Sequence, residues 1–176
     1  MAWRCSLPAS ATIPHPLARR PESRYDTAMP DVLFYHLEAR PLEEVIPQLL
    51  EKTLERGWRA VVEVGSIERA EALDSHLWTW RDDSFLPHAL AGEESDPHQP
   101  ILITTGSDNP NAAAVRFFVD RAVPQSADGY ERIVYMFSGH DPDAVAEARD
   151  AWRRLRDGNA VTYWQQEPNG RWVKKA

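Results

Sequence analysis

The sequence predicts a single α/β domain of the Rossmann-like three-layer class, with a mostly parallel sheet. Short apolar runs suited to buried strands alternate with segments of helical periodicity along most of the chain. Helices that separate consecutive strands connect parallel strands and cover both faces of the sheet they form. The 176 residues are enough for one ordinary domain with a substantial core.

The expected strands are short runs rich in β-branched, aromatic and leucine residues. They are placed at residues 32–37, 59–64, 100–105, 114–120, 132–137 and 160–166. We expect a polar loop between the second helix and the third of these strands. No internal repeat is present, so the strands belong to one sheet rather than to a repeated unit.

Three helices are expected between these strands, within 41–57, over 67–78, and from Asp141 to about Arg156. Pro47 interrupts the first pattern, so this helix either starts late or is kinked there, and Gly57 ends it. Ser66 is a suitable N-cap for the second helix. Asp141 followed by proline is a typical start for the third.

Residues 1–28 differ in composition from the rest of the chain. They are rich in proline, serine and arginine, without helical or strand periodicity, and lack the apolar region of a secretory signal. We expect a disordered extension or a mis-assigned start, followed by one domain at 29–176. Cys5 is the only cysteine, which excludes a disulfide framework and a thiolate metal site and favours the cytoplasm. No apolar run approaches the roughly 20 residues that a membrane span needs.

The chain is acidic, with a formal net charge of −7 at pH 7. Residues 1–28 carry four arginines and two acidic residues, so the remaining domain has a formal net charge of −9. Such a charge repels nucleic acid as a whole, and direct binding would need a strong local patch. We therefore expect nucleic acid to be reached only indirectly.

The usual cofactor and catalytic motifs are missing. No G-x-G-x-x-G, P-loop or G-x-S-x-G sequence follows a predicted strand, and the histidines lack zinc-ligand spacing. We predict no cofactor, no metal and no catalytic group. The alternative is a small enzyme or nucleotide-binding protein with a site near Ser138, His140 and Asp141, where a strand meets a helix. The structural interpretation makes Asp141 an N-cap and His140 a loop residue.

A stripe of the last helix combines arginines with a tryptophan and consists of Arg149, Trp152, Arg153 and Arg156. At about 100° per residue these side chains adjoin the buried face, with Trp152 at its boundary. This arginine stripe is either a solvated face partly paired with Glu147 and Asp150, or a surface for an acidic peptide with a hydrophobic end. Single-stranded nucleic acid is a third possibility, which the net charge disfavours.

A second aromatic group follows the second predicted helix. Large apolar side chains gather there at Trp78, Trp80, Phe85, Leu86 and Pro87, with the last three in a predicted loop. They belong either to the edge of the core or to a hydrophobic docking surface.

Five motifs occur in an order that resembles the chi subunit of bacterial DNA polymerase III. They are "LW" (77–78), "SFLPHALAG" (84–92), "PILIT" (100–104), "AR-x-x-W-R" (148–153) and "VTYWQQEPNGRW" (161–172). The resemblance spans about residues 30–174. It implies a Rossmann-like, non-catalytic accessory subunit of the polymerase holoenzyme.

The same resemblance implies two partners. One is the acidic, phenylalanine-ended C-terminal tail of single-stranded-DNA-binding protein, for which Arg149, Trp152 and Arg153 match the residues of the family. The other is the psi subunit of the clamp loader, or an equivalent partner, with Trp78 and Phe85 on the matching side and Pro87 beside them. Val145 stands where some members carry a lysine, so tail binding either rests more on Arg149, Arg153 and Arg156 or is weaker.

Overall fold

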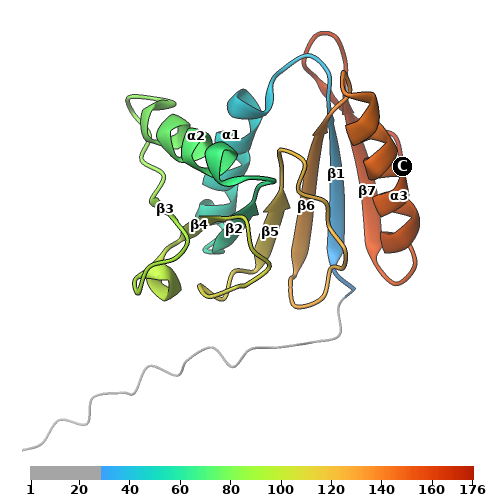
Figure 1. Ribbon diagram of the computed structural model, residues 1–176. Helices are drawn as coiled ribbons and strands as arrows, with labels where there is room; N and C mark the ends of the chain where they lie inside the picture. The colour runs from blue at the N-terminus through green and yellow to red at the C-terminus, as the bar shows by residue number, and fades with distance from the viewer. Residues whose placement is uncertain (1–28) are drawn as a thin grey trace, which may run out of the picture.

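A computed structural model describes residues 29–176, so the expectation for residues 1–28 lies outside the described part of the chain. The described strands form one sheet with the order β3-β4-β2-β5-β6-β1-β7-β8 (Figure 1). The strands are β1 (Asp31–Leu37), β2 (Ala60–Glu63), β3 (His88–Leu90), β4 (Ile101–Thr104), β5 (Val115–Phe118), β6 (Arg132–Ser138), β7 (Ala160–Gln166) and β8 (Trp172–Lys174). The helices are α1 (Leu42–Glu55), α2 (Ile67–Thr79), α3 (Pro142–Leu155) and a 3₁₀ turn, η1 (Asp96–His98).

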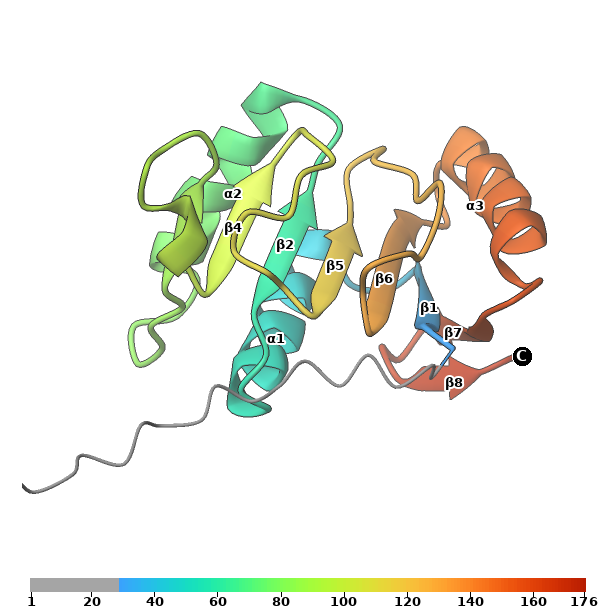
Figure 2. The same ribbon diagram turned by 90° about the horizontal axis from the view of Figure 1, so that it is seen from below.

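The predicted three-layer, mostly parallel arrangement is confirmed. Each strand pair is parallel except β7 with β8, which is antiparallel. Helices α1 and α2 lie on one face of the sheet and α3 lies on the other (Figure 2). The crossover through α1 leads from β1 toward β2, whereas the crossover through α3 leads from β6 to β7 on the other side of β1.

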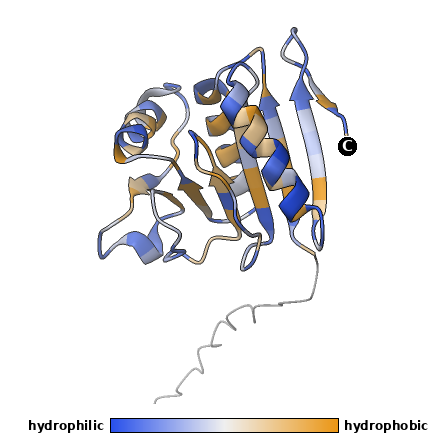
Figure 3. Cartoon of the chain, turned by 45° about the vertical axis from the view of Figure 1, so that its right-hand side comes forward, coloured by the Kyte–Doolittle hydropathy of each residue, from blue (hydrophilic) through white to orange (hydrophobic). Residues whose placement is uncertain are grey.

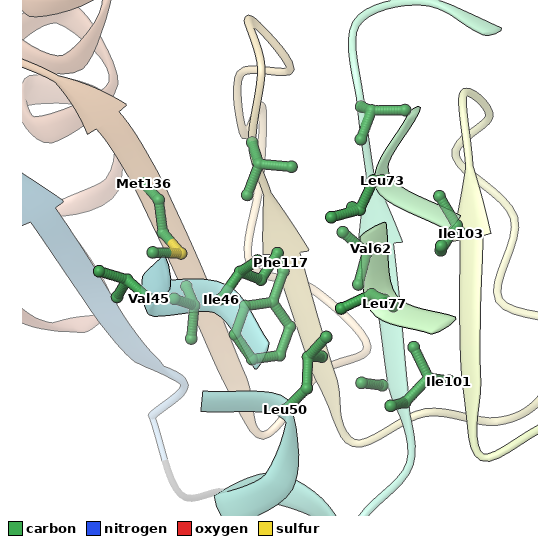
Figure 4. Close-up of a cluster of buried hydrophobic side chains, with 14 of the residues drawn as sticks. Val45, Ile46, Leu50, Val62, Leu73, Leu77, Ile101, Ile103, Phe117 and Met136 are labelled. Atoms are coloured by element: carbon green, nitrogen blue, oxygen red, sulfur yellow. The ribbon is translucent and has the colours of Figure 1, made fainter. Parts of the chain in front are cut away.

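The larger core lies between the sheet and helices α1 and α2. Its helical side chains include Val45, Ile46, Leu50, Leu73 and Leu77, which face Val62, Ile101, Ile103, Phe117 and Met136 of the strands (Figure 4). These residues alternate along their strands with residues of the opposite face, as the pleat requires. Burial of these apolar side chains therefore fixes which face of each strand meets α1 and α2.

The second core lies beneath α3. Four small or branched side chains of this helix are buried, namely Ala144, Ala148, Ala151 and Leu155. Alanine allows the helix backbone to approach the aromatic residues of β1 and β6 closely. The last turns of α3 are hydrophilic on the outside, while the central strands behind them are hydrophobic (Figure 3).

Pro47 lies inside α1, and a side chain of α2 compensates for its missing N–H. The helix begins at Leu42, ahead of the proline, so the late-start alternative is wrong. Pro47 cannot donate to the carbonyl of Glu43 four residues earlier. The Nε2 atom of His76 lies 2.8 Å from this oxygen. Because a carbonyl only accepts, Nε2 must carry the proton.

Two short strands at the ends of the sheet were not predicted. β3 lies in the stretch expected to be a polar loop, and β8 forms a hairpin with β7. Both have three residues, too few for periodicity to separate a strand from a loop. The other expected strands and helices are present, with boundaries that differ by one or two residues.

Candidate partner-binding surfaces

The arginine stripe lies on the outer side of α3, as helical geometry predicts. Arg149, Arg153 and Arg156 are exposed, and Trp152 is half-buried between them and the core. Arg154 projects to another side of the helix, where its Nη2 donates to the carbonyl of Pro124 at 3.1 Å. The helix therefore presents three guanidinium groups beside one aromatic ring.

Trp152 rests on aromatic residues of the two neighbouring strands. Its ring centroid lies 5.2 Å from that of Phe34 in β1 and 5.9 Å from that of Tyr163 in β7, both edge to face. Such pairs contribute about 0.5–1.5 kcal/mol each beyond the area they bury. Val145, about two helical turns earlier and also half-buried, packs against the same core. Val145, Trp152 and Tyr163 form a partly exposed apolar strip beside the arginines.

The hydroxyl of Tyr163 is held by a partly buried histidine, His36. The hydroxyl oxygen of Tyr163 and Nδ1 of His36 are 2.8 Å apart, and the His36 ring stacks on Phe137. Burial lowers the pKa of His36, which favours the neutral ring; Glu38 opposes this shift. In the neutral ring, the Tyr163 hydroxyl donates to Nδ1 and the proton sits on Nε2. That nitrogen lies 3.2 Å from Glu38 Oε1 without the alignment of a hydrogen bond.

The guanidinium groups of the stripe differ in how they are paired. Arg153 contacts Asp150 at 2.8 Å, and Arg156 contacts Asp157 at 3.6 Å, with all four side chains well exposed. Arg149 has no ion-pair partner within residues 29–176. Burial raises the pKa of the Tyr163 hydroxyl, and the charge of Arg149 opposes that rise. Glu147, expected to pair with the stripe, instead accepts from Arg121 at 2.7 Å.

The second predicted surface lies at the other end of the sheet, where α2 packs on β3 and β4 (Figure 1). Trp78 and Phe85 are 57% and 72% exposed, and their ring centroids are 6.0 Å apart. Pro87 is half-buried beside them, whereas Leu86 is buried in the core. We call Trp78, Phe85 and Pro87 the aromatic patch. Its exposure favours a docking surface over a core edge, because two large rings in contact with water are costly unless covered.

The aromatic patch has a rigid support. The ring of His88 lies beneath Trp78, with centroids 4.8 Å apart. Its Nδ1 is 2.6 Å from the carbonyl oxygen of Leu86, and its Nε2 is 3.2 Å from that of Asp74 in α2. These contacts tie the loop that carries Phe85 to the helix that carries Trp78.

A cleft of about 590 Å³ lies at the carboxyl ends of β1 and β6, and the alternative site residues Ser138, His140 and Asp141 line it. Asp141 accepts from the backbone N–H groups of Asp143 and Ala144 at 3.0 and 3.2 Å, as an N-cap does. Nε2 of His140 lies 2.7 Å from the carbonyl oxygen of Glu38. Ser138 accepts from the N–H of His140 at 3.2 Å. These contacts favour the structural interpretation of the junction.

The loop after β1, where this fold class places a phosphate, is occupied by a side chain of the protein. Oε1 of the buried Gln166 accepts from the N–H groups of Glu38, Ala39 and Arg40 at 3.1, 3.1 and 3.0 Å. Three convergent N–H groups of this kind form an anion-binding concavity when left free. An uncharged amide therefore takes the three N–H groups that could otherwise bind an anion.

Residues 29–176 offer neither a metal-binding cluster nor a membrane-spanning helix. No group of three or more histidine, cysteine, aspartate or glutamate side chains in this part of the chain is arranged to hold a metal ion. None of its helices has the length and apolar composition that crossing a membrane requires.

Comparison with known proteins assigns the family. The family model described as "DNA polymerase III chi subunit, HolC" matches residues 29–162, which is more than half of the chain. The chain belongs to the DNA polymerase III chi subunit family. The arginine stripe and the aromatic patch both lie within this matched part, whereas most of β7 and all of β8 lie beyond it.

Two curated relatives carry the chi name. The probable DNA polymerase III subunit chi of Rickettsia prowazekii is 31% identical over 81 residues, 46% of this chain and 49% of the relative. The DNA polymerase III subunit chi of Pseudomonas aeruginosa is 25% identical over 114 residues, 65% of this chain and 78% of the relative. This chi-family chain thus spans about half of the first relative and most of the second.

Sequence reasoning missed several residues that support the surfaces of this chi-family member. Tyr163, His36 and Phe34 form the floor under Trp152, and they come from strands that are distant in sequence. The parallel pairing of β1 with β7 brings them together, and one sequence carries no direct signal of that pairing. The alternation of Tyr163 with Trp164 indicated only that one of the two faces the last helix.

Proposed function

We propose that this chi-family chain is a non-catalytic replication adaptor. The arginine stripe binds the acidic, phenylalanine-ended C-terminal tail of single-stranded-DNA-binding protein. The aromatic patch docks a psi-like subunit, or an equivalent partner, and so links the chain to the clamp loader.

The observation that carries this proposal is the position, within residues 29–176, of one unpaired and two weakly paired arginines of α3 beside an apolar strip from α3 and β7. Arg149 is exposed three residues before Trp152 on α3, and it has no ion-pair partner among the described residues. A peptide carboxylate can take the guanidinium of Arg149 in a forked, charge-assisted contact. The terminal phenylalanine ring then covers the partly exposed ring of Trp152. Both halves of the ligand thereby find complementary groups within one helical face.

Arg153 and Arg156 strengthen tail binding by exchanging their present acidic partners for acidic residues of the tail. Arg153 and Arg156 are held only by exposed acids, and such surface pairs contribute little net free energy. Acidic residues of the tail replace Asp150 and Asp157 at small cost. Because these contacts are exposed, we expect micromolar-scale binding that weakens as salt is added.

The position of the aromatic patch, as well as its exposure, supports its proposed role in docking a psi-like partner. The aromatic patch lies at the β3–β4 end of the sheet, and the arginine stripe lies at the β6–β7 end (Figure 1). The two partners can therefore be bound at once without overlap. This separation is what an adaptor between two assemblies needs.

Anisotropy titration of a fluorescent acidic peptide ending in phenylalanine tests the proposal. The full chain is titrated as wild type, as Arg149→Ala, and as Arg154→Ala. Both variants remove one positive charge from α3, but Arg154 points away from the stripe. We expect Arg149→Ala to weaken binding by about 1–3 kcal/mol, because it removes a charge-assisted contact, and Arg154→Ala to leave it nearly unchanged. Absence of saturable binding at low salt, or equal losses in both variants, would refute the proposal.

A further inference from the structure

One end of the sheet is left open on the face that carries α1 and α2. Helices α1 and α2 lie under the other end of the sheet and do not reach β7 and β8 (Figure 2). The principal contacts of α1 are with β2, β6 and α2. No other helix of residues 29–176 lies on this side. A sheet of this class normally has both faces covered, so this uncovered part is unusual.

Strand register shows which side chains occupy this open face. Tyr35 packs against the α1 core, which assigns its face, and it lies beside Trp164 of β7. Trp164 in turn lies beside Lys174 of β8, and Gln166 lies beside Trp172. Neighbours across a sheet share a face, so Trp164, Trp172 and Lys174 are on the α1 side.

Two arginines and a further tryptophan continue this surface. The guanidinium carbons of Arg132 and Arg56 lie 5.3 and 5.6 Å from the ring centroid of Trp58. Both charges are also felt at Tyr35, where they oppose the rise in its pKa that burial causes. Tyr35 meets Trp172 edge to face at 4.9 Å. The open face thus consists of four aromatic residues and three cations, namely Tyr35, Trp58, Trp164, Trp172, Arg56, Arg132 and Lys174.

Of the aromatic residues on this face, Trp164 has the fewest packing partners within the described part of the chain. It is half-buried, and it packs against none of the three clusters of buried residues in the described chain. No aromatic or cation–π partner of Trp164 is present within residues 29–176. Its ring is therefore available to a ligand, whereas Trp58 is already engaged by two arginines.

The local charge opposes the charge of the whole chain. Residues 171–176 carry three cationic side chains and no acidic side chain, although the net charge of the chain is −7. Arg132 is paired with Asp31 at 2.7 Å, but Arg56 and Lys174 have no ion-pair partner among residues 29–176. The family match covers residues 29–162 and so ends before Trp164, Trp172 and Lys174.

We propose that the open face binds single-stranded nucleic acid directly. A base stacks on Trp164, and the neighbouring phosphates contact Arg56, Arg132 and Lys174. Aromatic rings interleaved with cations on an open sheet are the chemistry that holds single strands without sequence preference. An acidic peptide without aromatic residues would use the cations but would leave the aromatic rings without a matching group. The proposal departs from the expectation, drawn from net charge, that nucleic acid is reached only indirectly.

This proposal does not rest on the proposed function. The arginine stripe is on the α3 side of the sheet, and the open face is on the α1 side. Each surface can be altered while the other is left intact. A second contact that holds the protein near the same nucleic-acid strand strengthens weak direct binding, because it raises the effective concentration of that nucleic acid at the open face.

Anisotropy titration of a fluorescein-labelled oligothymidine of about 20 nucleotides tests the open face, with the full chain in low salt. We expect a Kd on the order of 10 µM, and a slope of log affinity against log salt of about −2 for three phosphate contacts. Lys174→Glu should weaken binding about tenfold. Lys175→Glu is the matched control, since it makes the same charge change on the next residue, which alternation places on the opposite face. We expect it to change binding less than about twofold.

A second variant tests stacking rather than charge. Trp164→Leu keeps an apolar side chain but removes the ring, and it should weaken oligonucleotide binding about fivefold or more. Binding of the acidic peptide by Trp164→Leu should equal that of wild type, which also shows that the variant is folded. Absence of oligonucleotide binding by wild type, or equal losses for Lys174→Glu and Lys175→Glu, would overturn the proposal. Equal competition by a polyglutamate peptide would also overturn it, because the surface would then select charge alone.

Discussion

Replacing Gln166 with methionine removes an acceptor on which three backbone N–H groups converge. Its Oε1 accepts from residues 38–40 at 3.0–3.1 Å, and the side chain is 2% exposed. Its Nε2 has no partner in the described structure, so no donor contact is lost with it. Methionine has a similar length and volume, which limits the effect to the hydrogen bonds.

The magnitude follows from the number of bonds. A typical intramolecular hydrogen bond contributes about 1 kcal/mol net, so three contribute about 3 kcal/mol. For a domain of this size that corresponds to a fall in Tm of roughly 6–12 °C. The assay is urea unfolding followed by circular dichroism, with the midpoint and slope compared between variants.

Gln165→Met is the matched control on the same strand. Gln165 makes one exposed hydrogen bond, to Glu38 Oε1 at 2.8 Å, so its loss should change the free energy of unfolding by less than about 1 kcal/mol. If Gln166→Met destabilised the chain no more than Gln165→Met, the loop after β1 would be held by other contacts. The three N–H groups would then not depend on Gln166 as their acceptor.

Two further predictions concern Gly139, which packs against His36, and Asp141, which caps α3. Gly139→Ala places a Cβ atom in overlap with the ring of His36, so it should destabilise the chain by about 1–3 kcal/mol. Because the overlap is with His36, the double variant Gly139→Ala/His36→Ala should lose less stability than the sum of the two single variants. Urea unfolding measures the three free energies. If the two single losses simply added in the double variant, the contact between Gly139 and His36 would be contradicted. Asp141 accepts from the N–H of Ala144, which lowers its pKa below 3.8. The stability it contributes is present above pH 3.8 and is lost as the pH falls through the lowered value. Asp141→Asn keeps the cap without titrating, so its acid-side loss should be smaller, and identical profiles would refute this role.

The sequence alone was sufficient to predict the layers of the fold but not the ends of its sheet. Long periodic segments such as 142–155 carry their own signal, because burial repeats every three to four residues. β3 and β8 have three residues each, and they become strands only through pairing with β4 and β7. Pro47 looked like a helix boundary because its missing N–H is visible in the sequence, whereas the donor from His76 is not.

For the candidate surfaces too, the sequence predicted what depends on a single helix but not what depends on the pairing of strands. The arginine stripe depends on one helix, so its geometry follows from helical spacing and is borne out in the positions of Trp152 and Arg149. The floor under Trp152 depends on the pairing of β1 with β7, which sequence spacing does not determine. The sequence pattern placed Trp164 in the last long strand without indicating which face of the sheet it occupies. The register places it on the open face, outside the buried clusters.

Chemical-shift mapping of the acidic, phenylalanine-ended peptide on the ¹⁵N-labelled chain tests the central claim most directly. The account predicts perturbations concentrated on the amides around Arg149 and Trp152 in α3 and around Tyr163 in β7. Amides around Trp78 and Phe85, at the other end of the sheet, should stay unchanged. Perturbations centred on the aromatic patch, or none at saturating peptide, would contradict the assignment of the arginine stripe as the tail-binding surface.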